Sequence, residues 1–186
     1  MPDLAADVAT RRLFFALWPD AGLRAAAVAR LVQIVPRGVG RPQRPDQLHV
    51  TLVFLGDVPE RRLAEVHAAA QASPGATFTI EFDSLEHWRR PRVLCLVAAD
   101  VPPPLAALVG ALKAALATRQ LPVDDRPFRP HLTLARKLAR FDGPARVEPL
   151  AWPATTLALV ESRPGPAGAR YEVLGSWPLA APPPPG

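Results

Sequence analysis

The chain carries the same short phrase twice, about half its length apart. Residues 48–52 read Leu-His-Val-Thr-Leu, and residues 130–134 read Pro-His-Leu-Thr-Leu. Each copy opens an apolar run and follows a loop that contains arginine and proline. Such runs are typical of β-strands, in which side chains two positions apart lie on one face. The phrase therefore predicts two related strands, each with a histidine beside a threonine on one face and an apolar face toward a core.

The paired residues are His49 with Thr51 and His131 with Thr133. A strand histidine can simply bond a neighbouring carbonyl, and for a single pair this structural interpretation is preferred. Two matched copies favour a shared chemical task instead. Imidazoles titrate near neutral pH, so two of them can serve as proton donor and proton acceptor in one reaction.

Opening of a cyclic phosphodiester needs this combination of groups. Water attacks phosphorus in line while an alkoxide leaves on the far side, so one group removes a proton and another delivers one. Thr51 and Thr133 supply hydroxyl donors for the non-bridging oxygens. The spacing does not tell which histidine is the acid, and a close pair titrates as a coupled unit. Only His67 and His87 remain as further histidines, so we predict a reaction without metal or cofactor.

The alternation of apolar runs with turn residues predicts an α+β fold. Neighbouring strands often lack the long crossover that parallel pairing requires, so mainly antiparallel sheets are expected. Residues 136–153 are expected to be irregular, and Gly56-Asp57 is expected to end the second strand. The predicted strands are 13–18, 48–55, 77–85, 92–99, 131–135, 155–161 and 170–177, and the predicted helices are 21–33, 59–72 and 104–119.

Length and composition permit a basic globular protein. The 186 residues fit one domain of two closely fused lobes, with 181–186 as a flexible proline-rich tail. A net charge of +5 permits an anionic partner such as RNA without indicating one. Cys95, the single cysteine, stands in an apolar run and is expected to be a buried strand residue. Neither a secretory signal nor a membrane-length apolar stretch is found, which predicts a cytoplasmic protein.

Further phrases, spread over nearly the whole chain, match one known family. They are Arg12-Leu-Phe-Phe-Ala-Leu, Gly40-Arg-Pro, Leu48-His-Val-Thr-Leu-Val-Phe-Leu-Gly56, Pro91-Arg-Val-Leu, Phe128-Arg-Pro-His-Leu-Thr-Leu-Ala-Arg136, Leu159-Val-Glu-Ser-Arg and Gly168-Ala-Arg-Tyr-Glu-Val-Leu. With them the sequence resembles the 2H phosphoesterases, and among these the RNA 2′,3′-cyclic phosphodiesterases, also called 2′-5′ RNA ligases. Two positions depart from the family pattern, since Cys95 stands where tryptophan is often found and Pro42 where an aromatic residue is frequent.

The resemblance implies two pseudo-symmetric lobes, each a mainly antiparallel sheet with helices on its outer face, enclosing a central groove. It implies that His49 is the proton donor to the 3′ oxygen, that His131 is the proton acceptor that activates water, and that Thr51 and Thr133 bind phosphate. The implied reaction is metal-independent hydrolysis of RNA 2′,3′-cyclic phosphate ends to 2′-phosphomonoesters, with 2′-5′ ligation as its reverse. The implied partner is such an RNA end, for example on a tRNA fragment, or a small cyclic nucleotide. We expect a monomer.

Four further residues are candidate RNA contacts. By the resemblance Arg136 contacts phosphate or RNA, although strict alternation places it opposite the motif histidine, so it has to reach the groove by a strand end or a bend. Arg41 either contacts phosphate or lies in a solvated loop. Phe14 or Phe15 can stack on a base, but a core-strand position is the preferred interpretation of both.

Two other functions stay open from the sequence. The first is an RNA-binding module whose motif strands hold phosphate without reaction, which predicts salt-sensitive binding and no product. The second is hydrolysis of small cyclic nucleotides instead of RNA. A product assay separates binding from catalysis.

Overall fold

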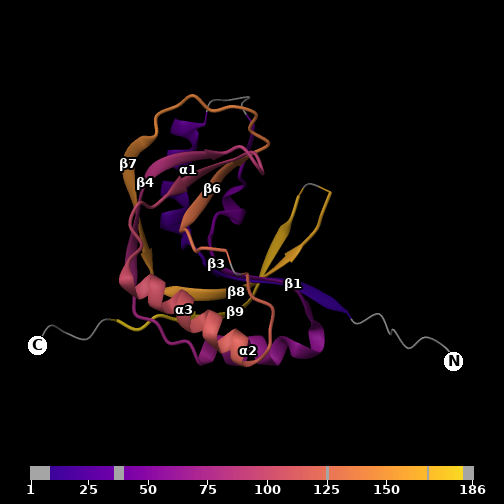
Figure 1. Cartoon of the computed structure of the whole chain (residues 1–186). Coiled ribbons are helices and arrows are strands. Elements are labelled where there is room, and N and C mark those ends of the chain that lie inside the picture. Colours follow the sequence, from indigo (N-terminus) through magenta and orange to yellow (C-terminus); the bar gives the residue numbers. More distant parts are fainter. Residues whose placement is uncertain (1–8, 36–39, 125, 167, 182–186) are drawn as a thin grey trace, which may run out of the picture.

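Two antiparallel β-sheets make up the fold (Figure 1). The computed structural model describes residues 9–35, 40–124, 126–166 and 168–181. The expected proline-rich tail falls mainly on residues 182–186, outside the described residues. The strands are β1 (Thr10–Leu17), β2 (Arg41–Pro42), β3 (Val50–Pro59), β4 (Phe78–Trp88), β5 (Val93–Val97), β6 (His131–Arg136), β7 (Arg146–Ala154), β8 (Thr156–Arg163) and β9 (Arg170–Pro178); the helices are α1 (Ala21–Ile34), α2 (Leu63–Gln71) and α3 (Pro103–Thr118), with short 3₁₀ turns at Pro45–Gln47 and Glu60–Arg62.

The two sheets repeat one arrangement. The strand order is β3-β1-β8-β9 in one sheet and β2-β6-β5-β4-β7 in the other. Apart from the two-residue edge strand β2, each sheet begins with a His-x-Thr strand, followed by the strand that precedes it in the chain across a helix: β1-α1-β3 in one sheet and β5-α3-β6 in the other. The pairs between these strands are antiparallel. The predicted α+β class with two antiparallel lobes is confirmed.

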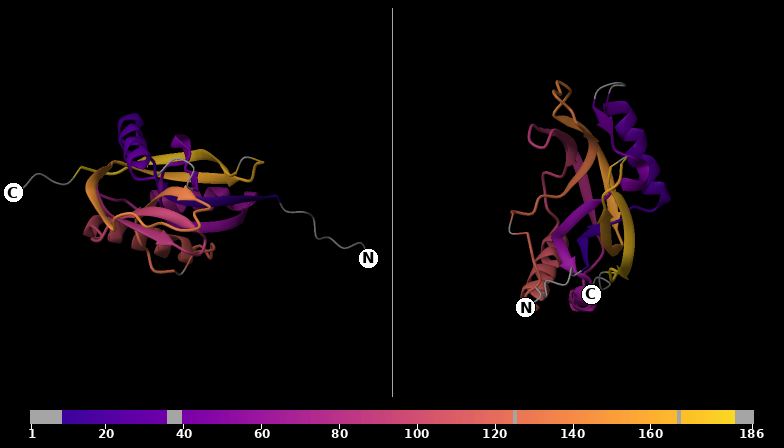
Figure 2. Two further views of the ribbon diagram at one scale, coloured as in Figure 1. Left: turned by 90° about the horizontal axis from the view of Figure 1, so that it is seen from above. Right: turned by 90° about the vertical axis from the view of Figure 1, so that its right-hand side faces the viewer.

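The helices pack on the outer faces of the sheets, as predicted. The largest hydrophobic cluster contains the buried residues of all three helices together with one face of each sheet. The opposite faces form two small clusters without helix residues, one around Phe14 and Ala16, the other around Val93 and Cys95. Although α1 follows β1, it packs against β7 of the other sheet, whereas α2 and α3 lie together along the four-stranded sheet (Figures 1 and 2). None of the helices described has the length and apolar character needed to cross a membrane.

The predicted elements lie close to the observed ones, and the differences occur at strand ends and sheet edges. β3 does not end at Gly56, because this glycine adopts φ +73° at little cost and the strand continues to Pro59. β4 likewise runs through part of an expected loop. The expectation of irregular structure up to residue 153 is wrong, since this segment contains β7. Its Pro149 and Pro153 are tolerated because β7 is an edge strand, where a missing N–H breaks no sheet ladder.

Trp152 tests how much β7 contributes to the core. Its side chain is 1% exposed, and its ring lies edge-on to Phe82 with centroids 6.1 Å apart. Because Trp152→Ala leaves a cavity, we expect the free energy of unfolding to fall by about 3–5 kcal/mol, measured by urea titration with far-UV circular dichroism. Val32→Ala, at a position that is 66% exposed, is the control and should cost less than about 0.5 kcal/mol. An equally small loss for Trp152→Ala would show that β7 is not part of the core.

Candidate active site

Both motif histidines make the same backbone hydrogen bond. His49 directly precedes β3, and His131 opens β6. Nδ1 of His49 lies 2.7 Å from the carbonyl oxygen of Gln47, and Nδ1 of His131 lies 2.8 Å from that of Arg129. A carbonyl oxygen only accepts, so each Nδ1 carries the hydrogen and donates it. The bond to a neighbouring carbonyl therefore uses only one nitrogen of each ring, and Nε2 of each neutral ring is a proton acceptor.

Three aromatic side chains surround His49. Its ring stacks on Trp18 with a centroid distance of 5.5 Å and an interplanar angle of 14°. Phe14 and Tyr171 each lie 5.0 Å from it, Tyr171 edge-on. These contacts fix the plane of the imidazole and remove water from around it.

The ring of His131 is held through one carboxylate. Trp88 lies 4.7 Å from the His131 ring, and its Nε1–H donates to Glu86 at 2.9 Å. Arg129, whose carbonyl accepts from His131, also donates to Glu86, at 2.7 Å from Nη1 to Oε2. Glu86 thereby positions both residues that contact the ring.

Both histidines favour the neutral form. The pKa of His49 is lowered to about 4, chiefly because burial disfavours the charged ring, with smaller contributions from the positive charges of Arg136 and His131. Burial also lowers the pKa of His131, and the charges of Arg129 and Arg136 act in the same direction. Arg136 therefore influences both rings, which places it close to the two motifs at once.

Arg136 faces the groove because β6 contains a bulge. Strict alternation along the strand places this side chain opposite the motif histidine and threonine, as predicted from the sequence. The register against β5 shifts between Thr133 and Ala135, so Leu134 is an extra residue and the alternation restarts after it. Arg136 then pairs with Val93, which belongs to the groove-side cluster. The bend that the sequence analysis required is this bulge.

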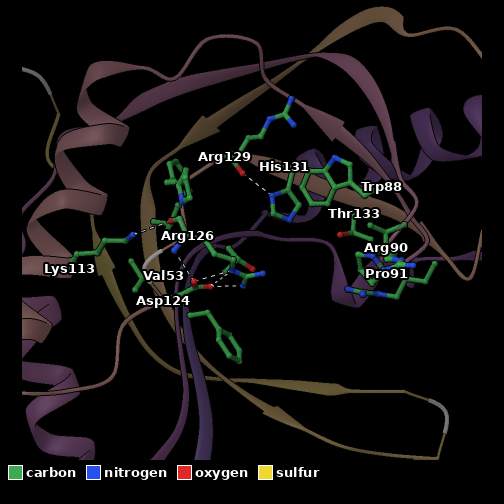
Figure 3. A pocket seen from close by; sticks show the side chains of 17 residues that line it. Val53, Trp88, Arg90, Pro91, Lys113, Asp124, Arg126, Arg129, His131 and Thr133 are labelled. Carbon is green, nitrogen blue, oxygen red and sulfur yellow. Dashed lines mark hydrogen bonds and ion pairs between the residues drawn. The ribbon is translucent and has the colours of Figure 1, made fainter.

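A cavity of about 600 Å³ lies between the two sheets (Figure 3). Side chains from both motif strands line it: Thr51, His131, Thr133 and Arg136. His49 is not among the lining residues. Its ring contacts Tyr171, which lines a second cavity of about 350 Å³ that shares Arg136 with the first. The structure thus brings the two sequence motifs together at one groove, with His49 set deeper than His131.

The segment between α3 and β6 forms the far wall of the larger cavity. The N–H of Asp124 donates to the carbonyl of Phe54 at 3.2 Å, which ties this segment to the edge of β3. The Asp124 carboxylate holds the guanidinium of Arg126 with an Nε–Oδ2 distance of 2.8 Å. Lys113 reaches from α3 to the carbonyl of Arg126 at 3.4 Å, as Figure 3 shows. This wall places positive charge beside the motif residues.

The other predicted RNA contacts lie in three different settings. Phe15 is 0% exposed and belongs to the main core, so the expectation that it stacks on a base is wrong: its side chain alternates away from the groove. Phe14 lies on the groove side but is 3% exposed and packs against His49. The alternative interpretation of both as core-strand residues describes these positions. Arg41 is exposed, pairs with Arg136 through β2, and lines the smaller cavity.

The aromatic residues around the histidines do not stand out in the sequence. Trp18 follows the end of β1, Trp88 ends β4, and Tyr171 lies near the start of β9. The chain has only four tryptophans and one tyrosine, so their position at strand ends was the available signal. Nothing in the local pattern connects them to a particular histidine, because each contact joins distant segments.

The remaining cysteine and histidines have structural settings. Cys95 is fully buried in β5, as predicted, and burial raises the pKa of its thiol to about 12, so it stays protonated at neutral pH. His67 packs against Trp177, and Nε2 of His87 lies 3.0 Å from the carbonyl oxygen of Leu138. Within the ranges that the structure describes, three or more His, Cys, Asp or Glu side chains do not gather where they could hold a metal ion.

Comparison with known proteins identifies the family. Residues 19–165 match the family described as the 2′-5′ RNA ligase superfamily. The chain belongs to this superfamily. A relative named RNA 2′,3′-cyclic phosphodiesterase from Thermus thermophilus is 36% identical over 183 residues, 90% of each chain. Another of that name from Escherichia coli is 33% identical over 126 residues, 68% of this chain and 72% of the relative.

Solved structures of the 2′-5′ RNA ligase superfamily share the fold. The crystal structure of E. coli LigT in apo form matches with a TM-score of 0.83 at 30% identity, covering 92% of this chain and 98% of LigT. TT0787 of T. thermophilus matches with a TM-score of 0.73 at 30% identity, covering 91% and 98%. The family resemblance seen in the sequence is confirmed.

The low pKa of His49 predicts that anion binding takes up a proton. An anion held near both rings favours their charged forms, so its affinity should rise as the pH falls from neutral toward the pKa of the free ring, by up to about tenfold per pH unit. Sulfate is the suitable probe because it does not itself titrate in this range. Calorimetry in buffers of different ionisation enthalpy measures the proton uptake. The variant His49→Gln should take up fewer protons; pH-independent sulfate affinity in the wild type would refute the coupling.

Proposed function

We propose that this protein hydrolyses 2′,3′-cyclic phosphate ends of RNA to 2′-phosphomonoesters without a metal ion. The observation that carries the proposal is the matched pair of Nδ1–carbonyl hydrogen bonds, which leaves a basic Nε2 on each motif histidine. Its relatives in T. thermophilus and E. coli bear the name RNA 2′,3′-cyclic phosphodiesterase and align over most of the chain.

In the proposed reaction His131 is the base and His49 is the acid. Nε2 of His131 takes a proton from water as the water oxygen bonds to phosphorus. The bond from phosphorus to the ribose 3′ oxygen breaks on the opposite side, and His49 delivers a proton to that oxygen. The product is a 2′-phosphate beside a free 3′-hydroxyl, and exchange with solvent returns both rings to their starting state. The assignment of the two roles follows the family resemblance, since the two rings have the same backbone bond.

Three cavity residues suit the developing negative charge. Thr51 and Thr133 carry short, stiff hydroxyl donors for the non-bridging oxygens. Arg136 adds a positive charge that acts on both histidines and also donates from Nε to Gln43 at 3.1 Å, which fixes part of its guanidinium. Hydrogen bonds of this kind act more strongly in a groove with little water than in solvent.

The substrate itself favours the proton that His49 has to deliver. In the free protein this ring is neutral at neutral pH because its pKa is about 4. The phosphodiester carries a negative charge, which raises the pKa of a nearby imidazole. Protonation of the acid is then coupled to substrate binding, and the two rings do not repel each other before the anion arrives.

The size of the cavity supports ligation as a second activity. Water needs about 30 Å³, whereas the cavity beside His131 measures about 600 Å³. A 5′-hydroxyl of a second RNA can therefore occupy the place of the attacking water. With that nucleophile the same proton transfers yield a 2′-5′ phosphodiester.

Single histidine variants test the proposed reaction. We expect His49→Ala and His131→Ala to slow the opening of a cyclic-phosphate oligonucleotide by about 10²–10⁴-fold each, because each removes one proton transfer. Chromatography of the products in the presence of EDTA measures the rate and the position of the phosphate. His67→Ala, which lies outside both cavities, is the matched control and should keep wild-type turnover.

Two results would exclude the proposal. Near-normal turnover by both variants would remove the histidine pair from the reaction. Salt-sensitive binding of RNA by the wild type without any product would favour a binding module instead. Loss of wild-type activity in EDTA would contradict the metal-independent mechanism.

A further inference from the structure

The two motif strands differ at one corresponding position in the groove. Like β6, β3 carries a bulge: its register against β1 shifts between Thr51 and Val53 and leaves Leu52 as the extra residue. Phe54 therefore returns to the groove face and is the counterpart of Arg136, each standing five positions after its histidine. Both side chains line the larger cavity. Where one strand presents a cation, the other presents an aromatic ring.

The ring of Phe54 is partly exposed and well supported. It packs on the small groove-side cluster and pairs across the strands with Phe14, which contacts His49. The guanidinium of Arg12 lies 4.9 Å from the ring centroid, and Asp57 lies 3.7 Å from that guanidinium. The ring is therefore held in place at the border of the cavity.

Two other aromatic residues of the cavity already have partners. Trp88 lies against His131 and donates to Glu86, so its position serves the histidine. Phe128 is partly buried against the main core. Phe54 is the aromatic residue of the cavity that belongs to the same strand and face as a motif threonine.

We propose that Phe54 stacks on the base of the terminal nucleotide, the one that carries the cyclic phosphate. This inference rests on the proposed function. Thr51 and Phe54 share one face of β3, so a phosphate held by the threonine hydroxyl brings its own nucleoside toward the neighbouring ring. Stacking accepts every base because each has a π face, and its strength varies from base to base. The first motif strand thus binds the nucleoside, while Arg136 on the second acts on the phosphate.

The contribution of the base can be isolated by comparing two ligands. The ratio of the Kd values of inorganic phosphate and adenosine 2′-monophosphate, measured by calorimetry, reports what the nucleoside adds to binding. Phe54→Leu keeps an apolar side chain but removes the π face, and should lower this ratio by about 5- to 150-fold. Phe54→Trp should retain it. Phe141→Leu, the same change outside both cavities, should leave it unaltered.

Kinetics with adenosine 2′,3′-cyclic phosphate give a second readout. Phe54→Leu should raise KM by a similar factor with little change in kcat, because the base is bound equally in the ground and transition states. A ratio that Phe54→Leu leaves unchanged, in a variant with wild-type circular dichroism, overturns the stacking role even where turnover is normal. If the ratio falls as expected but the wild type forms no product, the proposed reaction fails while the base-stacking role stands.

Discussion

Each motif histidine donates its Nδ1–H to the carbonyl two residues earlier, and the chemistry of the groove depends on this bond. It selects the tautomer and turns Nε2 away from the backbone. The residue between carbonyl and histidine is buried in both copies, Leu48 in one and Pro130 in the other. This burial puts the carbonyl and the imidazole on the same side of the chain, so the bond is a consequence of how each strand enters its sheet.

Electrostatics and packing act together on the two rings. Phe14, Trp18 and Tyr171 remove water from His49, and this burial is the main reason for its low pKa. Arg136 adds a positive charge that disfavours protonation of both rings in the free protein and attracts an anion to the same place. A phosphate bound there offsets both effects, since it replaces lost hydration and neutralises the cation. The groove is thus poised for an anion that brings protons with it.

Much of this site could be predicted from the sequence, because it follows from strand periodicity. Alternation puts each motif threonine beside its histidine, and the apolar run around Cys95 predicts its burial. The groove-facing position of Arg136 and of Phe54 could not be predicted, since a bulge adds one residue without leaving a mark in the hydrophobic pattern. The aromatic contacts of His49 join β1 and β9, segments whose adjacency arises only from sheet order. For the same reason the prolines of β7 are acceptable only once its edge position is known.

The tautomers of His49 and His131 test the central claim most directly. Long-range ¹H–¹⁵N correlation spectra of the histidine rings distinguish a neutral ring protonated at Nδ1 from one protonated at Nε2. Assignments come from variants that each lack one histidine. We predict that at neutral pH both rings are neutral and carry hydrogen on Nδ1. A ring protonated at Nε2 in either motif would contradict the shared backbone bond, and with it the acid–base pair.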